Sequence, residues 1–353
     1  MGDPVAEGFT GGHSETYDAF LLDRNDRQDR RLKLLGGSLS WSKSLDVQGS
    51  GTITIITDEN ADWTVDRVQI WYRAELGQEK IQYPMIVGIV GRPEVDEQAG
   101  TTTIKFFDKV TLLAEDRIAK TWSFPAGKNV VDAVKEIVES VGSFHNVPDL
   151  GQTLRTAMSW PVGTPKLTMV NKLLESIHYV PVRADGQGVL LSHYDSTTPR
   201  ISHNFTPGPE CVAGPVESDE RDLSDIVNRV IGISTADGDN EPLVSVIDNV
   251  DQSSPWSIPR RGRVLAITQD NIDVSDQNAL DDYVRDLLYA RSQVVWTQVI
   301  KHLRVRLDIS QAVIAPNGLP FVVEEITQEL TPGAMCSTKV RRMDQFVTAT
   351  GTN

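Results

Sequence analysis

The sequence predicts an α+β protein that is mainly β, with two antiparallel β-barrel domains, an α-rich insertion, and a helix that crosses between parts of the second barrel. Two patterns predict this class. Short segments that alternate apolar and polar residues recur along the chain with Gly, Asn and Asp between them, and three other segments carry apolar residues three and four positions apart. A chain of 353 residues also exceeds what one hydrophobic core usually fills, so several domains are expected.

The first β domain is expected at about residues 18–110, after a flexible arm formed by residues 1–17. The arm is rich in Gly and polar residues and lacks any periodicity, which favours mobility. Short strands separated by turn residues then follow one another, which is typical of a small antiparallel barrel. The segment 51–57 alternates Thr with Ile, so one of its faces is expected to be polar and the other buried.

The period changes in residues 111–180, where an α-rich insertion is expected. Apolar residues of one predicted helix form a single stripe, at Val130, Val134, Ile137, Val138 and Val141. Asn129 is the expected N-cap of this helix, because its short side chain can accept a backbone N–H of the first turn. A second helix is expected near 168–178 with Thr168 as its N-cap.

The second β domain is expected at 181–350. It starts with a hairpin around the turn Asp185–Gly186, and strands resume at 226–235, which is rich in β-branched residues. A helix at about 275–292 is expected to cross between the parts of this domain, because its apolar residues keep one stripe.

Composition excludes several classes of protein. The chain has 49 acidic and 34 basic residues, a formal charge of −15, which opposes sequence-independent binding to nucleic acid. No apolar stretch approaches the length of a membrane-spanning helix, so no membrane insertion is expected. Cys211 and Cys336 lie far apart without CxxC spacing, which predicts two free thiols in a reducing compartment.

Motifs for chemistry are missing from the sequence, so no catalytic, cofactor-binding or metal-binding residues are predicted. The histidines have neither HxH nor HExxH spacing, and neither a GxSxG elbow nor a GxxxxGK phosphate loop occurs. The acidic segment 237–241 departs from the DxDxDG order of a calcium loop, so a solvated hairpin tip is the preferred interpretation.

Several polar and aromatic residues in expected loops are instead candidates for contact with partners or for lining a channel. They are Asp58, Glu59, Asp62, Trp63, Asp237, Asp239 and Trp256. Trp63 and Trp256 are included because the sequence places them in loops, where an aromatic side chain is expected to be exposed.

The order of the segments resembles the phage tail-tip and baseplate hub family, which includes late-control D proteins and the N-terminal module of secretion-system spikes. The resemblance covers about residues 18–350 and rests on motif order, since each motif alone is weak. The motifs are WSKSLDVQGSGTITI, TIKFFDKVTLLAED, NVVDAVKEIVESVG, MVNKLLESIHYVPVRADGQGVLL and DIVNRVIGIS. The acidic arm and the lack of a long C-terminal extension depart from the family pattern.

The resemblance implies a non-enzymatic structural subunit of the virion, assembled in the cytoplasm of the bacterial host. Each copy would carry two tube-type barrels, so a homotrimer would present six barrels to the sixfold tail tube and adapt it to a threefold tip. Implied partners are the tail tube or distal tail protein, the tape measure protein and downstream tail-tip or receptor-binding proteins. DNA would pass without specific binding, helped by acidic side chains that repel it.

Two alternative functions come from other classes. A receptor-binding or carbohydrate-binding tail protein would expose aromatic residues at one end of a barrel. A tail-associated cell-wall hydrolase would need paired carboxyls at a fixed separation in a cleft, and the abundance of carboxylates alone does not indicate such a pair.

Overall fold

The computed structural model describes residues 13–76, 79–194, 201–208, 211–222, 226–234, 241–272, 274, 276–292 and 295–342. The fold is α+β and mainly β, as predicted. The chain divides into two compact units, one of Met1–Glu217 with Val299–Val340 and the other of Ser218–Gln298 with Arg341–Asn353. Of the expected arm, residues 1–12 lie outside the described part, and a strand begins at His13.

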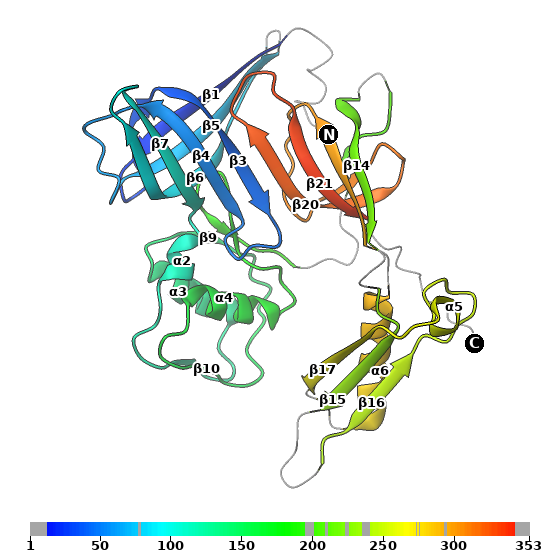
Figure 1. Cartoon of the computed structure of the whole chain (residues 1–353). Helices are drawn as coiled ribbons and strands as arrows, with labels where there is room; N and C mark the ends of the chain where they lie inside the picture. The colour runs from blue at the N-terminus through cyan, green and yellow to red at the C-terminus, as the bar shows by residue number, and fades with distance from the viewer. Residues whose placement is uncertain are drawn as a thin grey trace. The chain divides into compact units, whose positions relative to one another are not determined.

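Strands β1 to β7 form the first β region (Figure 1). They are β1 (His13–Leu22), β2 (Gln28–Leu32), β3 (Leu34–Ser42), β4 (Gly49–Ile56), β5 (Arg67–Leu76), β6 (Glu79–Asp96) and β7 (Thr101–Asp108). Their hydrogen-bonded order is β3-β4-β7-β6-β5-β1-β2. Lys33 alone separates β2 from β3, so the strands at the two ends of this order are neighbours in the sequence. All seven strands contribute side chains to one buried core.

A Gly pair shapes β3. The register of β3 on β4 shifts between Leu34 and Gly36, and Gly37 has a φ of +155°, a backbone conformation that side chains disfavour. A Cβ on Gly37 would lie 2.3 Å from the carbonyl oxygen of Thr52, whereas a Cβ on Gly36 would meet nothing within 4 Å. Only one of the two glycines is therefore required by the packing.

The insertion has its own core. Its helices are α2 (Thr111–Glu115), α3 (Val130–Glu139) and α4 (Lys166–Glu175), and its short strands are β8 (Trp122–Phe124), β9 (His145–Asn146), β10 (Met158–Trp160), β11 (Arg183–Ala184) and β12 (Leu190–Leu191). Val182 and Leu190 belong to this core, so the β11–β12 hairpin, expected in the second β domain, packs with the insertion instead.

The predicted helix caps have different outcomes. Asn129 is the N-cap of α3 and accepts the N–H of Asp132 at 3.0 Å, which confirms that prediction. The prediction for Thr168 is wrong, because α4 begins at Lys166 with Pro165 as its N-cap. Pro165 has no side-chain acceptor, so α4 begins without a side-chain cap.

The β11–β12 hairpin contacts the first β region through two glycines. A Cβ on Gly186 would lie 2.0 Å from the carbonyl oxygen of Pro84, and a Cβ on Gly188 would lie 2.4 Å from the side chain of Lys109. Lys109 is 1% exposed, and its ammonium lies 2.5 Å from Asp26 in the β1–β2 turn. The turn, the first β region and the insertion are thus packed around one buried lysine.

The second β region continues the same sheet. Its strands are β13 (Ile201–Asn204), β14 (Ala213–Asp222), β18 (Val295–His302), β19 (Ala312–Ile314), β20 (Pro320–Glu329) and β21 (Cys336–Arg342). Strand β20 pairs with β3 over the register Glu325 to Ser42 through Glu329 to Ser38, so both β regions share one sheet. Among the described strands the path runs from β14 to β2 without closing by hydrogen bonds.

The second unit contains a mixed three-stranded sheet covered by a helix. Strand β15 (Arg229–Ser234) pairs with β16 (Val244–Asp248) and with β17 (Ala266–Ile272), and α5 (Ile258–Arg261) lies between β16 and β17 in sequence. Helix α6 (Gln277–Arg291), expected to cross the second β domain, packs on this sheet instead. Gly232 permits the contact, because a Cβ there would lie 2.3 Å from Val284.

Candidate interaction surfaces

The loop between β4 and β5 holds four of the predicted residues. Asp58 accepts hydrogen bonds from Arg30 of β2, from Nε at 2.7 Å and from the terminal nitrogen at 3.1 Å, and this pairing lowers the pKa of Asp58. Asp62 accepts the N–H and the hydroxyl of Thr64, which lowers its pKa as well. Both carboxylates are therefore engaged in fixing the loop.

Trp63 and Glu59 differ in their surroundings. Trp63 is partly buried and packs against the core of the first β region, although the sequence predicted an exposed side chain. Its position explains the fixed loop, because the indole holds the loop against the core. Glu59 is exposed at the turn, and Asp62 is exposed as well, so both of these side chains are open to a partner.

The remaining predicted residues belong to the second unit. Trp256 is partly buried beside Arg261, whose guanidinium lies 5.9 Å from the indole ring. Asp237 and Asp239 lie outside the described residues. The structure brings Asp58, Glu59, Asp62 and Trp63 together in one loop, and the interface role of all seven residues stays a prediction.

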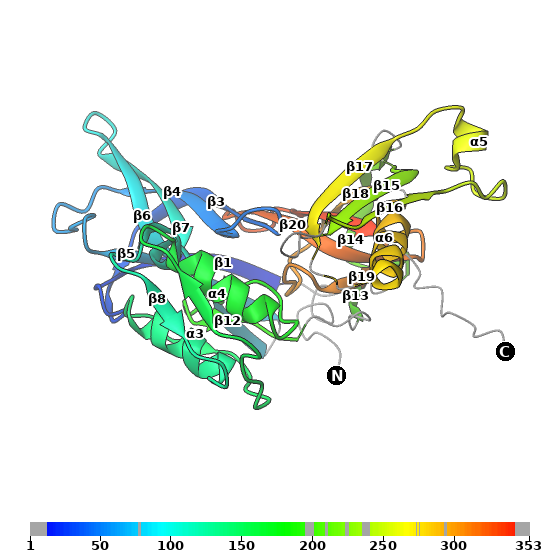
Figure 2. The same cartoon turned by 90° about the horizontal axis from the view of Figure 1, so that it is seen from below.

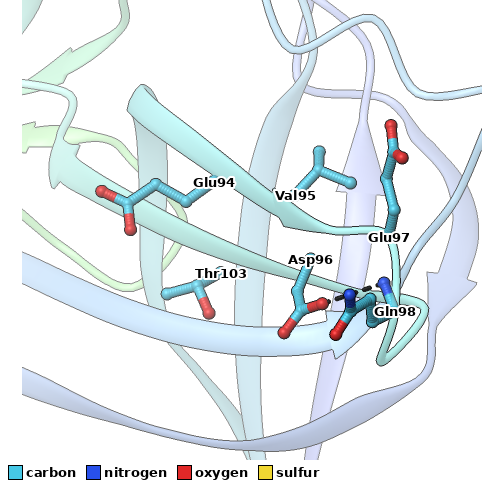
Figure 3. Close-up of a pocket in the computed structure, with 6 residues that line it drawn as sticks. All are labelled: Glu94, Val95, Asp96, Glu97, Gln98 and Thr103. Carbon is cyan, nitrogen blue, oxygen red and sulfur yellow. Dashed lines mark hydrogen bonds between the residues drawn. The ribbon is translucent and has the colours of Figure 1, made fainter.

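An open pocket of about 500 Å³ lies on the β6–β7 hairpin (Figure 3). It is lined by Glu94, Val95, Asp96, Glu97, Gln98 and Thr103. Asp96 accepts the backbone N–H groups of Gln98 and Ala99, each at 3.0 Å, so this carboxylate closes the turn. The hairpin extends past Arg67, the first residue of β5, because β5 pairs with β6 only as far as Ile89 and β6 continues to Asp96. Figure 2 shows this hairpin projecting from the sheet. The pocket is acidic, open and built from a hairpin tip.

One face of the shared sheet consists largely of hydroxyl side chains, and we call it the hydroxyl face. Its residues come from β20, β3, β4 and β7 and are Thr327, Ser38, Ser40, Ser42, Ser50, Thr52, Thr54, Thr101 and Thr103. All are partly exposed, and the hydroxyls of Thr54 and Thr103 lie 3.1 Å apart across two strands. Ile56, Lys105, Phe107, Glu325 and Glu329 share this side of the sheet.

The sequence carried a signal for this face that a single strand does not reveal. Serine or threonine occupies every second position from Ser38 to Ser42 in β3, from Ser50 to Thr54 in β4, and at Thr101 and Thr103 in β7, which is the period of a strand face. Only the pairing of these strands with one another, and of β3 with β20, joins the separate runs into one surface.

A buried polar network joins the two β regions within the first unit. Arg304 donates to the hydroxyl of Tyr83 at 2.9 Å and to Gln328 at 2.8 Å, and Gln328 donates to the hydroxyl of Tyr17 at 2.8 Å. Glu15 accepts the hydroxyl of Tyr72 at 2.9 Å and the N–H of Gly333 at 2.8 Å. These bonds connect residues from opposite ends of the chain and satisfy charges that burial would otherwise penalise.

A buried histidine stabilises the second β region. His302 is 1% exposed, and the centre of its ring lies 4.8 Å from that of Phe205. Its Nδ1 donates to the carbonyl of Leu303 at 2.6 Å. Its Nε2 accepts the hydroxyl of Thr338 at 2.8 Å. Burial lowers the pKa of His302 to about 4. The imidazole is therefore neutral near pH 7.

We expect the free energy of unfolding to fall by about 2 kcal/mol because of His302 as the pH decreases from about 7 to about 5. The folded pKa lies below that of the unfolded chain, so acid protonates the unfolded state first. Urea unfolding at both pH values gives the change in the free energy of unfolding for the wild type and for His302→Gln. The difference between these two changes measures the contribution of His302. Equal pH dependences would contradict it.

The comparison with His302→Gln is needed because Asp108 acts in the opposite direction. Burial raises the pKa of Asp108 to about 6, although its carboxylate accepts the N–H groups of Gly49 at 2.7 Å and Val110 at 2.9 Å. Its stabilising contribution is present at low pH and is lost as the pH rises through 6. The wild-type profile alone therefore mixes two opposing groups.

Two negative findings concern the described part of the chain. Its His, Cys, Asp and Glu side chains form no group of three placed to hold a metal ion. Within the same residues, no helix is both long enough and apolar enough to span a membrane.

The fold matches solved structures, whereas the sequence matches no protein-family model and no curated protein. A tail protein from Neisseria meningitidis MC58 is similar with a TM-score of 0.64 and 12% identity, over 93% of this chain and 97% of that one. The 43 kDa tail protein of prophage MuSo2 from Shewanella oneidensis has a TM-score of 0.58 and 14% identity, over 93% and 99%.

A third match comes from a complex. A structure of the Francisella PdpA-VgrG complex has a TM-score of 0.56 and 9% identity, over 96% of this chain and 60% of that one. This chain therefore shares its fold with two tail proteins, one of them from a prophage, and with a structure of the PdpA-VgrG complex. The expected resemblance to the tail-tip and baseplate hub family is thereby confirmed at the level of the fold.

Proposed function

We propose that this chain is a structural, non-enzymatic subunit of a phage tail-tip hub. Three copies form a ring that caps the distal end of the tail tube, adapts a sixfold tube to a threefold tip and lets DNA pass during ejection. The observation that carries the proposal is the pairing of β3 with β20, which joins two β regions of one chain in a single sheet. A ring of three such chains has six β regions to meet a sixfold tube.

The two β regions are proposed to act as tube-type barrels. The first supports this role, because β1 to β7 surround one core and its end strands β2 and β3 are separated by Lys33 alone. The second consists of β13, β14 and β18 to β21. The α-rich insertion, with the β11–β12 hairpin that packs in its core, and an arm that precedes β1 complete the proposed domains. The partners are the tail tube or distal tail protein, the tape measure protein and downstream receptor-binding proteins, within a virion assembled in the bacterial cytoplasm.

The mass of the purified full-length chain tests the proposal. We expect an assembly of three copies by light scattering, with threefold symmetry in negatively stained electron micrographs, because a ring that meets six positions with two β regions per chain needs three chains. An obligate interface of this kind buries more than about 2,000 Å², so the assembly is expected to survive dilution. A stable monomer, or a copy number incompatible with three, would overturn it.

A further inference from the structure

The insertion contains one sequence pattern twice. Ser, Pro, Gly, Val, Glu and Ser occur at the same spacing in residues 123–140 and, 36 positions later, in residues 159–176. Each segment runs from a short strand through a loop into a helix, from β8 into α3 and from β10 into α4, and the two helices pack against each other (Figure 1). Phe124 and Trp160 are buried at equivalent positions. A fixed offset that repeats the same local structure indicates an internal repeat.

The hydrogen bonds between the two halves of the repeat come in matched pairs, where the first half is residues 116–143 and the second half is residues 152–179. Strands β8 and β10 are antiparallel, and Ser123 lies opposite Ser159, its own equivalent. In the other pairs, donor and acceptor exchange between the halves, as a local twofold axis requires. These backbone N–H to carbonyl bonds run from Ile118 to Thr164 and Leu154 to Lys128, from Gly163 to Ile118 and Gly127 to Leu154, and from Lys166 to Asp116 and Val130 to Gln152.

The helices of the two halves also end alike. Ser140 and Ser176 each donate a hydroxyl to the carbonyl three residues earlier, both at 2.6 Å. Two residues further on, Gly142 and His178 both have a positive φ, of 70° and 57°. This conformation closes a helix and is favoured by glycine. His178 adopts it because it occupies the position that glycine holds in the first half.

We infer that the two halves are copies of one structural unit, and that the surface with which each half binds the other is built to recognise a second copy of that unit. Both helices contribute to one core, so the pairing is completed within a single chain. A contact about a twofold axis closes on itself, whereas a ring needs heterologous contacts. The pairing therefore goes beyond the proposed function and does not depend on it.

The equivalence of the halves explains a buried polar atom. The ammonium of Lys166, a residue that is 7% exposed, lies 2.6 Å from the carboxylate of Asp116. The equivalent residues across the axis are Val130 and Gln152, which share the same backbone bond. Oε1 of Gln152 is buried and has no hydrogen-bond partner among the described residues. An apolar side chain stands where a lysine would bind it.

A pair of substitutions in the full-length chain tests the equivalence. Val130→Lys places an ammonium at a position that is 0% exposed, so faster hydrogen exchange is expected for the amides of α3. Adding Gln152→Asp recreates the Asp116–Lys166 pair across the axis. Exchange in α3, measured by mass spectrometry, is then expected to be about tenfold slower than in Val130→Lys alone, a coupling typical of residues in contact.

Val131→Lys, with and without Gln152→Asp, is the matched control. Val131 is 7% exposed and is equivalent to Leu167, which belongs to the core, so Gln152→Asp is expected to give no recovery there. No recovery for Val130→Lys, or equal recovery for both lysines, would overturn the equivalence.

The reverse substitution tests the equivalence without a buried lysine. Lys166→Val with Asp116→Gln installs the residues of the Val130–Gln152 pair at the other site. Hydrogen exchange in α4 is expected to stay close to that of the wild type, because apolar replacement of a buried ion pair is often neutral. Loss of protection throughout α4 would overturn the equivalence. A chain that stays monomeric by mass would overturn the proposed function alone.

Discussion

Replacing Gly37 with alanine is expected to destabilise the protein by about 3 kcal/mol or more, because steric overlap and backbone strain each cost about 1–3 kcal/mol. The new methyl group would lie 2.3 Å from the carbonyl oxygen of Thr52 and 2.8 Å from the Cα of Ile53, so backbone atoms would have to move. The φ of +155° adds strain for any side chain. The carbonyl of Gly37 also accepts the N–H of Leu330 at 2.8 Å, so the substitution is expected to weaken the contact between the two β regions.

The adjacent residue provides a matched control. Gly36→Ala introduces the same methyl group into open space, and its expected effect is within about 1 kcal/mol because the unfolded chain loses freedom while the folded chain gains no overlap. Thermal and urea unfolding of both variants measure the difference. Similar unfolding midpoints for the two variants would show that the close approach at Gly37 can relax, contrary to this account.

The second large effect is expected for Asp26→Asn, which removes the charge that two buried cations share. Asp26 lies 2.5 Å from Lys109 and 2.5 Å from Arg67, whose side chains are 1% and 12% exposed. Asparagine keeps the size of the residue and tolerates its φ of 62°, so the change isolates the charge. Leaving buried charges without a partner costs about 3–5 kcal/mol, which urea unfolding would reveal.

Two further variants complete this test. Asp29→Asn removes a nearby carboxylate that is 54% exposed, and its expected effect is within about 0.5 kcal/mol. Combining Lys109→Met with Asp26→Asn removes the ammonium that has lost its partner and keeps an apolar side chain of similar length. The double variant is therefore expected to be more stable than Asp26→Asn alone. Additive losses in the double variant would exclude coupling between Asp26 and Lys109.

Local patterns were sufficient for the elements whose residues contact near neighbours in the chain. The apolar stripe from Val130 to Val138 is buried in α3, and the side chain of Asn129 caps the helix. The alternation of Thr and Ile in β4 does place Ile53 and Ile55 in the core. In each case the period of the element itself decides which side chains face inward.

Predictions failed where a distant segment decided the outcome. Strand β15 was expected in the second β domain because its residues favour strands, yet it forms a sheet with β16 and β17 under α6. Propensity identifies a strand and leaves its partner open. Trp63 was expected to be exposed in a loop, and the loop folds back onto the core so that the indole packs there.

The sequence by itself determined the mainly β class, the α-rich insertion, and a serine and threonine alternation in several strands. The tertiary structure alone decided that β3 pairs with β20, that the hydroxyls of four strands form one face, and that Lys109 is buried against Asp26. The physical reason is that period and capping are local properties of a strand or helix. The pairing of segments nearly 300 residues apart depends on the burial and hydrogen bonding of the whole chain, which only the folded structure contains.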